Sequence, residues 1–210
     1  MQPKSFLISK ARIVIDIGIV IDLTFWEMAK KNINDVIVYD PGELKAEQAM
    51  QIAALVKATW PEAEKTFDEC VALFMENRDS RSFYVMQDNG QIIASAQTFP
   101  RIIQHEGGAL EVRALAGVCV DMDYRGWGLG KKLVREVFDH VADEPNGISL
   151  FQTKVPLFYE KLGAVIIDNK FYDSTSEDPE KSPWWSDYVM VYSKSVAWPD
   201  GLIDLNGAGY

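Results

Sequence analysis

The sequence predicts an α/β fold, and three observations lead to this prediction. Strand-like and helix-like segments alternate from Ile33 onward. Asn89 and Gly90 separate two apolar runs, and an Asn-Gly pair favours a β-hairpin because both residues tolerate a positive φ angle. A long β-like run leads into a Gly-rich turn at residues 125–131, which opens an amphipathic helix. The chain has 210 residues, enough for one such domain to bury a full core.

The first half of the domain is expected to contain a strand, two helices and the hairpin. Turn signals at Asp40 and Pro61 end the first strand and the first helix. Cys70 lies on the apolar face of the second helix, so we interpret its thiol as a core group and not as a nucleophile. The expected elements, in chain order, are 36–39, 43–59, 63–76, 82–87 and 91–99.

The second half is expected to alternate strands and helices again. The helix at 127–141 has a clear apolar face, formed by Leu133, Val134, Val137, Phe138 and Val141. The expected strands are 109–121, 148–151, 164–169 and 187–192, and a short helix covers 156–162. The tail after Trp198 is rich in glycine and is expected to lie on the surface. We therefore expect one domain at 33–195 followed by a tail at 196–210.

Residues 1–32 are interpreted as an N-terminal extension. Isoleucine alternates with other residues along 13–21, which is strand periodicity. The segment could be an added strand, or it could lie upstream of the true start, because Met28 would serve as one. Charged residues leave no uncharged stretch of about 18 residues, which argues against a membrane helix. These residues are Lys10, Arg12, Asp16 and Asp22.

Charge and cysteine content exclude several classes of function. The formal net charge is −10, and Lys and Arg do not gather into a broad patch, which argues against nucleic acid as a partner. The two cysteines, Cys70 and Cys119, stand far apart, so we expect neither a disulfide scaffold nor a metal site. This cysteine usage fits a reducing cytoplasm, and we expect a cytoplasmic protein that does not bind a membrane.

The Gly-rich turn has the properties of a phosphate-binding loop. Backbone N–H groups at a helix start lack partners within the helix, and the macrodipole adds partial positive charge there. Glycines allow a close approach of the backbone to a pyrophosphate, and Arg125 and Lys131 add formal charge. A Walker A loop requires Ser or Thr after Gly-Lys, where this chain has Lys132. A Rossmann fingerprint requires a different glycine spacing in an opening βαβ unit, so both alternatives fail.

The turn resembles motif A of the GNAT superfamily of acyl-CoA-dependent N-acyltransferases, Q/R-x-x-G-x-G/A, at Arg125, Gly128 and Gly130. The run Phe-Tyr-Glu-Lys-Leu-Gly-Ala at 158–164 resembles motif B of the same superfamily. Order and spacing agree over residues 33–192. The resemblance implies the GNAT fold, which has a mixed, mostly antiparallel sheet of about seven strands. Helices flank this sheet, and it is splayed at the motif A strand.

The resemblance also implies acetyl-CoA as cosubstrate. The pantetheine arm would lie between the strand at 111–120 and the strand at 148–151, with the pyrophosphate on the amides of 125–131. Many family members carry Asn where this chain has Gln152, so the sequence departs from the pattern there. The expected cofactor-binding residues are Val118, Cys119, Val120, Arg125, Gly126, Trp127, Gly128, Leu129, Gly130, Lys131 and Gln152.

Two catalytic roles are expected from the same comparison. Tyr159 matches the family tyrosine that often protonates the departing CoA thiolate, and a phenol with a pKa near 10 suits that task. Glu111 is the candidate general base, and His105 beside Glu106 is the alternative. Cys119 is interpreted as a packing residue because the family usually transfers the acyl group directly. His140 is expected to be solvated.

Three functions remain open from the sequence. The chain could be an N-acetyltransferase for a small-molecule amine, a protein or peptide N-acetyltransferase, or a non-catalytic acyl-CoA sensor. The acceptor would bind between residues 43–76 and the polar loop at 168–187. Trp184 and Trp185 in that loop suggest an enclosed apolar acceptor site, although packing against the sheet edge explains them equally well. A homodimer is also left open.

Overall fold

The computed structural model describes residues 12–14, 20–22, 33, 35–179, 181–194 and 197–210. These residues divide into two compact units, residues 1–35 and 36–210. In the first unit, β1 (Arg12–Val14) pairs antiparallel with β2 (Val20–Asp22), and the two strands form a sheet of their own. The isoleucine alternation thus contains two short paired strands, and residues 15–19 between them lie outside the described part.

The second unit is built on a nine-stranded sheet with the order β3-β4-β5-β6-β7-β10-β8, to which β11 and β9 are joined through β5. The pairing is antiparallel except between β6 and β7 and between β11 and β9. The mostly antiparallel sheet predicted above is confirmed. Its strands are β3 (Ile37–Tyr39), β4 (Ser82–Asp88), β5 (Gln91–His105), β6 (Gly108–Val120), β7 (Ile148–Thr153), β8 (Val165–Ile166), β9 (Lys170–Tyr172), β10 (Tyr188–Ser193) and β11 (Leu202–Asp204).

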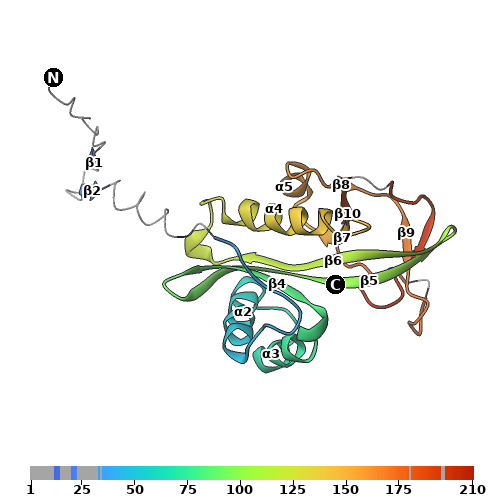
Figure 1. The fold of residues 1–210 in the computed structure, drawn as a ribbon, viewed down its shortest axis with the longest axis horizontal. Coiled ribbons are helices and arrows are strands. Elements are labelled where there is room, and N and C mark those ends of the chain that lie inside the picture. The colour runs from blue at the N-terminus through green and yellow to red at the C-terminus, as the bar shows by residue number, and fades with distance from the viewer. Residues whose placement is uncertain (1–11, 15–19, 23–32, 34, 180, 195–196) are drawn as a thin grey trace, which may run out of the picture. The chain divides into compact units, whose positions relative to one another are not determined.

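Helices cover both faces of this sheet (Figure 1). One face is covered by α2 (Ala46–Thr59) and α3 (Phe67–Glu76), and the other by α4 (Leu129–Ala142) and α5 (Pro156–Glu160). A capping box between Thr66 and Glu69 fixes the start of α3, because each side chain bonds to the backbone N–H of the other residue. The apolar face predicted for α4 is confirmed, since all five of its residues are buried.

The hairpin between β4 and β5 forms where the sequence predicts it. Asn89 and Gly90 adopt φ angles of 49° and 82°, as a tight turn with two positive φ angles requires. One apolar core packs α2 and α3 against this part of the sheet, and its buried members include Leu44, Phe74 and Phe83. Cys70 is 5% exposed within this core, which agrees with its interpretation as a core residue.

The prediction of a surface tail is wrong. Strand β11 pairs in parallel with β9 and contacts β5 at Gln104. Ile203 and Leu205 are fully buried in a second core with Trp184. The aromatic ring of Tyr210 packs against Phe99 with 5.1 Å between centroids. The glycine-rich composition did not reveal these few apolar side chains. Their burial in the second core stabilises the fold.

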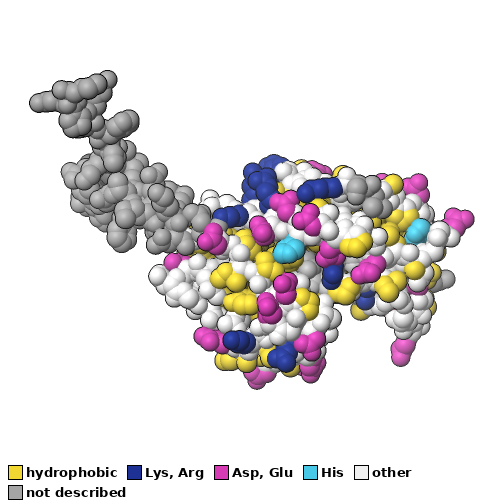
Figure 2. Space-filling model, viewed as in Figure 1, with side chains coloured by type: hydrophobic (Ala, Val, Ile, Leu, Met, Phe, Trp, Pro, Cys, Tyr) yellow, Lys and Arg dark blue, Asp and Glu magenta, His cyan; other side chains and the backbone are white. Residues whose placement is uncertain are grey.

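The charges of the second unit are mixed on the face that Figure 2 shows. Figure 2 shows acidic and basic side chains interspersed over the visible face and not gathered into one patch of either sign. Among the residues that the structure describes, no helix is long and apolar enough to span a membrane.

Candidate active site

The Gly-rich turn links β6 to α4 and is tied to the β4–β5 hairpin. A short 3-10 helix, η2 (Met122–Tyr124), begins this connection. The hydroxyl group of Tyr124 donates a hydrogen bond to the Asp88 carboxylate at 2.7 Å, and the Tyr124 ring packs on Trp127 with 5.4 Å between centroids. These contacts hold the turn in position before α4 begins.

Two glycines give the turn its shape. Gly126 and Gly128 have φ angles of +82° and +81°, which side-chain-bearing residues rarely adopt. A Cβ atom added to either glycine would meet nothing within 4 Å. The space in front of the turn is therefore open, as a ligand that approaches the backbone requires.

The start of α4 presents backbone donors to this open space. Gly128 is the N-cap, and the first helical bond runs from the Lys132 amide to the Gly128 carbonyl at 3.1 Å. The amides of Leu129, Gly130 and Lys131 precede that bond and have no partner within the helix. Together with the helix macrodipole they favour an anion.

The turn also contacts the end of β6. The Arg125 guanidinium donates from Nε to the Val120 carbonyl at 3.1 Å. A Cβ atom on Gly130 would lie 3.5 Å from the Val120 side chain and 3.8 Å from Phe158. Gly130 thus faces the protein, and its lack of a side chain lets the first turn of α4 lie close to β6 and α5.

Strands β6 and β7 separate next to this turn. They pair in parallel at Arg113 with Ser149 and at Ala114 with Leu150, and within the described residues the pairing continues no further. The remainder of β6, up to Val120, leaves β7 on the side where the Gly-rich turn begins. The predicted splay is confirmed.

A β-bulge interrupts β6 in the separated part. Gln97 pairs with Ala116 and Ser95 pairs with Cys119, so one residue of β5 opposes both Gly117 and Val118. Gly117 has a φ angle of +63°, the left-handed conformation that such a bulge uses. A bulge leaves its extra residue out of the ladder. One of the two residues, Gly117 or Val118, is therefore left without a ladder partner.

Tyr159 lies on α5, directly after β7. Its side chain is 6% exposed, and its ring contacts Phe151 and Phe158 with centroid distances of 4.6 and 4.8 Å. Burial raises the pKa of the Tyr159 hydroxyl, and the nearby Cys119 thiol raises it further when that thiol is ionised. The phenol therefore keeps its proton at neutral pH, although the raised pKa also makes it a weaker acid than an exposed phenol.

The Cys119 thiol is buried on β6. It is 3% exposed, and its sulfur lies 3.2 Å from the Ser95 hydroxyl oxygen. Burial raises the pKa of this thiol to about 11, so it is protonated at neutral pH. Because the thiolate is the nucleophilic form, this environment argues against a covalent role for Cys119.

The sequence model of the acetyltransferase (GNAT) domain family matches residues 41–167, more than half of the chain. The protein belongs to the GNAT family. Membership supports acyl transfer in general. The matched residues contain the bulge, the Gly-rich turn and Tyr159. No curated protein matches the chain.

Solved GNAT structures share the fold at low sequence identity. A GCN5-related N-acetyltransferase from Kribbella flavida is 21% identical with a TM-score of 0.52, and the match covers 63% of this chain and 33% of that one. A probable N-acyltransferase from Enterococcus faecalis is 16% identical with a TM-score of 0.51, covering 62% and 32%. This chain thus spans about a third of either protein. The GNAT family protein YhbS from Escherichia coli, solved in complex with CoA, is 21% identical with a TM-score of 0.55, covering 81% and 88%.

The side chain of Gln152 is hydrogen-bonded to the polar loop and to the C-terminal segment. Its side-chain oxygen accepts hydrogen bonds from the amides of Trp185 and Ser186, at 3.1 and 2.9 Å, and its nitrogen donates to the Tyr210 carbonyl at 2.8 Å. Three of the four hydrogen bonds available to a Gln amide are therefore used to hold the loop and the tail. In this GNAT domain Gln152 is an anchor for those segments.

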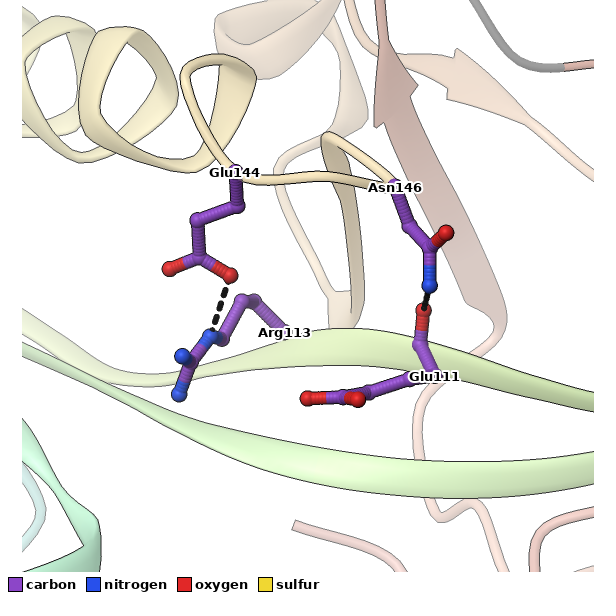
Figure 3. A network of polar contacts seen from close by, with 4 residues as sticks. All are labelled: Glu111, Arg113, Glu144 and Asn146. Atoms are coloured by element: carbon purple, nitrogen blue, oxygen red, sulfur yellow. Dashed lines mark hydrogen bonds and ion pairs between the residues drawn. The ribbon is translucent and has the colours of Figure 1, made fainter.

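Glu111 lies far from the predicted cofactor site. It is near the start of β6, seven residues before Val118, which at ~3.3 Å per residue is roughly 23 Å away. Figure 3 shows its neighbours, Asn146, which donates to the Glu111 backbone carbonyl at 3.1 Å, and the ion pair of Arg113 with Glu144 at 2.6 Å. Glu111 is thus separated from the bulge by several residues of strand, and its role as general base stays a prediction.

The two histidines also lie away from the turn. His105 ends β5 and accepts a hydrogen bond from the Gly107 amide at 3.1 Å, at the end of the β5–β6 hairpin opposite to the bulge. His140 is exposed near the end of α4, with its ring 5.7 Å from that of Tyr84.

The two tryptophans of the polar loop have different environments. Trp184 is 8% exposed and packs edge-on against Phe171 and Tyr210. Packing therefore explains Trp184, and an acceptor site is not needed for it. Trp185 is 68% exposed. A hollow of about 550 Å³ lies beside β9 and β11, but the Gly-rich turn contributes none of its lining, which comes from Ile167, Asp168, Asn169, Lys170, Trp198, Asp200, Gly201 and Leu202.

Proposed function

We propose that this GNAT protein transfers an acetyl group from acetyl-CoA to the primary amine of an acceptor. The observation that carries the proposal is the open space at Gly126 and Gly128, directly before the start of α4, whose first amides have no partner within the helix. That arrangement suits the pyrophosphate of CoA. The separation of β6 from β7 suits the pantetheine arm. The complex of YhbS with CoA supports this choice of donor.

The reaction proceeds by direct attack in a ternary complex. The amine nitrogen attacks the carbonyl carbon of the acetyl group, and the carbon–sulfur bond breaks. Tyr159 gives its hydroxyl proton to the departing sulfur and regains a proton from solvent, while the amine loses one proton to water. The products are an N-acetylated amine and CoA thiol. The buried and protonated state of Cys119 supports direct transfer over an acetyl-enzyme intermediate.

A thiol-release assay tests this function. Acetyl-CoA is supplied with a panel of small amines, amino acids, polyamines and peptides, and free CoA is measured over time. We expect amine-dependent thiol release with at least one small amine. Release with peptides alone would favour a protein N-acetyltransferase. CoA binding without release in any mixture would indicate an acyl-CoA sensor and would overturn the proposal.

A further inference from the structure

A line of polar and aromatic side chains crosses one face of β5 next to the bulge. Gln97, Phe99 and Arg101 alternate along the strand and therefore share a face. Phe83 pairs with Gln97 and contributes to the core under α2 and α3, so this is the sheet face that those helices cover. Figure 1 shows that α4 lies on the opposite face.

Arg81 lies over this line. Its guanidinium donates to the Gln97 side-chain oxygen at 2.8 Å and stacks over the Phe99 ring at 4.1 Å from its centroid. The side chain is largely withdrawn from water, and burial together with the positive charge of Arg101 lowers its pKa. Arginine nevertheless stays protonated in proteins, so a cation is held here.

Arg101 supplies a second cation beside the first. Its guanidinium donates to the Ala208 carbonyl and lies over the Tyr210 ring at 5.4 Å from its centroid. The Nε atoms of Arg81 and Arg101 are both buried and have no hydrogen-bond partner among the described residues. These two N–H groups have almost no accessible surface, so a further partner would have to contact the remaining N–H groups of each guanidinium.

No carboxylate of the described residues neutralises the two arginines. The ion pairs within that part of the chain are Arg78 with Asp79, Arg113 with Glu144 and Lys194 with Asp139. Two adjacent, partly buried cations without an anion raise the free energy of the folded state. They therefore lower the stability of the protein. The protein has more carboxylates than basic groups, with a net charge of −10, so two arginines without a carboxylate partner are unusual in it.

Arg81 also lies next to the bulge. The Gln97 nitrogen is 3.3 Å from the position that a Cβ atom on Gly117 would take, so the Gln97 side chain lies against the bulge. Gln97 contacts Arg81 on its other side. An acceptor whose amine reaches the bulge from this sheet face would have its remaining groups beside the guanidinium pair.

We propose that Arg81 and Arg101 bind an anionic group of the acceptor, a carboxylate or a phosphate, so that the substrate is an amine that also carries a negative charge. The proposal rests on the proposed function and specifies its substrate class. Guanidinium groups recognise both anions through planar, charge-assisted hydrogen bonds, which the Nη groups not already bonded to Gln97 or Ala208 would provide. An anion here also relieves the repulsion between the two cations.

Matched substrate pairs test this inference. We would compare glycine with glycinamide and phosphoethanolamine with ethanolamine, measuring kcat/KM for acetylation of each. At least one anionic member should exceed its neutral match by about tenfold or more. The pair that shows the preference identifies the anion as carboxylate or phosphate. Equal rates within both pairs would refute the anion site while leaving amine acetylation intact, whereas absence of any transfer would count against the proposed function itself.

Variants separate binding from folding. Arg81→Gln and Arg101→Gln should each reduce the preference for the anionic substrate by about tenfold, mainly through KM, and should leave CoA affinity unchanged. Arg81→Lys should retain part of the preference, because lysine keeps the positive charge but lacks the planar set of N–H donors of the guanidinium. Arg78→Gln, on the surface beside Asp79, is the control and should not change the ratio. A ratio that is unchanged in Arg81→Gln with CoA binding intact would contradict the proposal, even if Arg101→Gln failed to fold.

Discussion

The side chain of Gln97 lies against Gly117, so that a Cβ atom on this glycine would come within 3.3 Å of the Gln97 nitrogen. Gly117 belongs to the bulge of β6, and Gln97 accepts a hydrogen bond from Arg81 at 2.8 Å. The bulge and the Arg81 guanidinium are therefore joined through one side chain.

Substitution of Gly128 should abolish CoA binding. In Gly128→Glu, a side chain enters the open space before α4, and its negative charge repels the pyrophosphate. We expect CoA to raise the melting temperature of the wild type and to leave that of the variant unchanged. Gly201→Glu is a matched control, because Gly201 has a similar φ angle of +87° and equally open surroundings. Wild-type CoA affinity in Gly128→Glu would show that the pyrophosphate binds elsewhere.

Removal of the Tyr159 hydroxyl should slow turnover without affecting CoA affinity. Tyr159→Phe keeps the packing with Phe151 and Phe158 but loses the proton donor. We expect kcat to fall on the order of 100-fold, as for the loss of a general acid. Tyr39→Phe, a partly buried tyrosine of β3, is the control for the substitution. A variant with wild-type kcat would assign Tyr159 to the core alone.

The Cys119 thiol should make stability depend on pH in the alkaline range. Burial raises its pKa from the ordinary value of 9.0 to about 11 in the folded state. The unfolded chain therefore releases the proton first as pH rises, and stability is lost between pH 9 and pH 11. The difference in unfolding free energy between wild type and Cys119→Ala should shrink by about 2 kcal/mol over this range. Denaturant titrations at pH 8 and pH 10.5 would measure it, and a difference that stays constant or grows would contradict the burial of a neutral thiol.

Removal of the N-terminal residues should leave the domain intact. The sheet, its four helices and the Gly-rich turn all belong to the unit formed by residues 36–210. A chain that starts at Met28 is expected to fold, bind CoA and retain activity. It should be at least as soluble, because it lacks a β-branched segment with strand periodicity. Circular dichroism and CoA titration of the shortened chain provide the check, and loss of folding would assign residues 1–27 to the folded domain.

The sequence predicted those features that local patterns determine. The hairpin at Asn89 and Gly90, the apolar face of α4 and the position of the Gly-rich turn follow from residue type and spacing within one element. Gly117 was overlooked, although an isolated glycine within a strand is a known signal of a bulge.

Features that depend on distant pairing could not be predicted from local patterns. Strands β9 and β11 have three residues each and pair with one another across about thirty intervening positions. The side-chain partners of Gln152 come from the polar loop and from Tyr210, whose positions depend on that pairing. The role of Glu111 as general base stays a prediction, because it depends on where the acceptor amine binds along β6.

Mass spectrometry of the reaction mixture tests the central claim most directly. The protein is incubated with acetyl-CoA, with and without an active amine. The molecular masses of the small molecules and of the intact protein are then measured. We predict that the amine gains one acetyl group for each CoA thiol released and that the protein mass stays unchanged when the amine is omitted. A protein that becomes acetylated and releases thiol without the amine would contradict direct transfer, and an absence of acetylated product with every amine of the panel would contradict N-acetyltransferase activity.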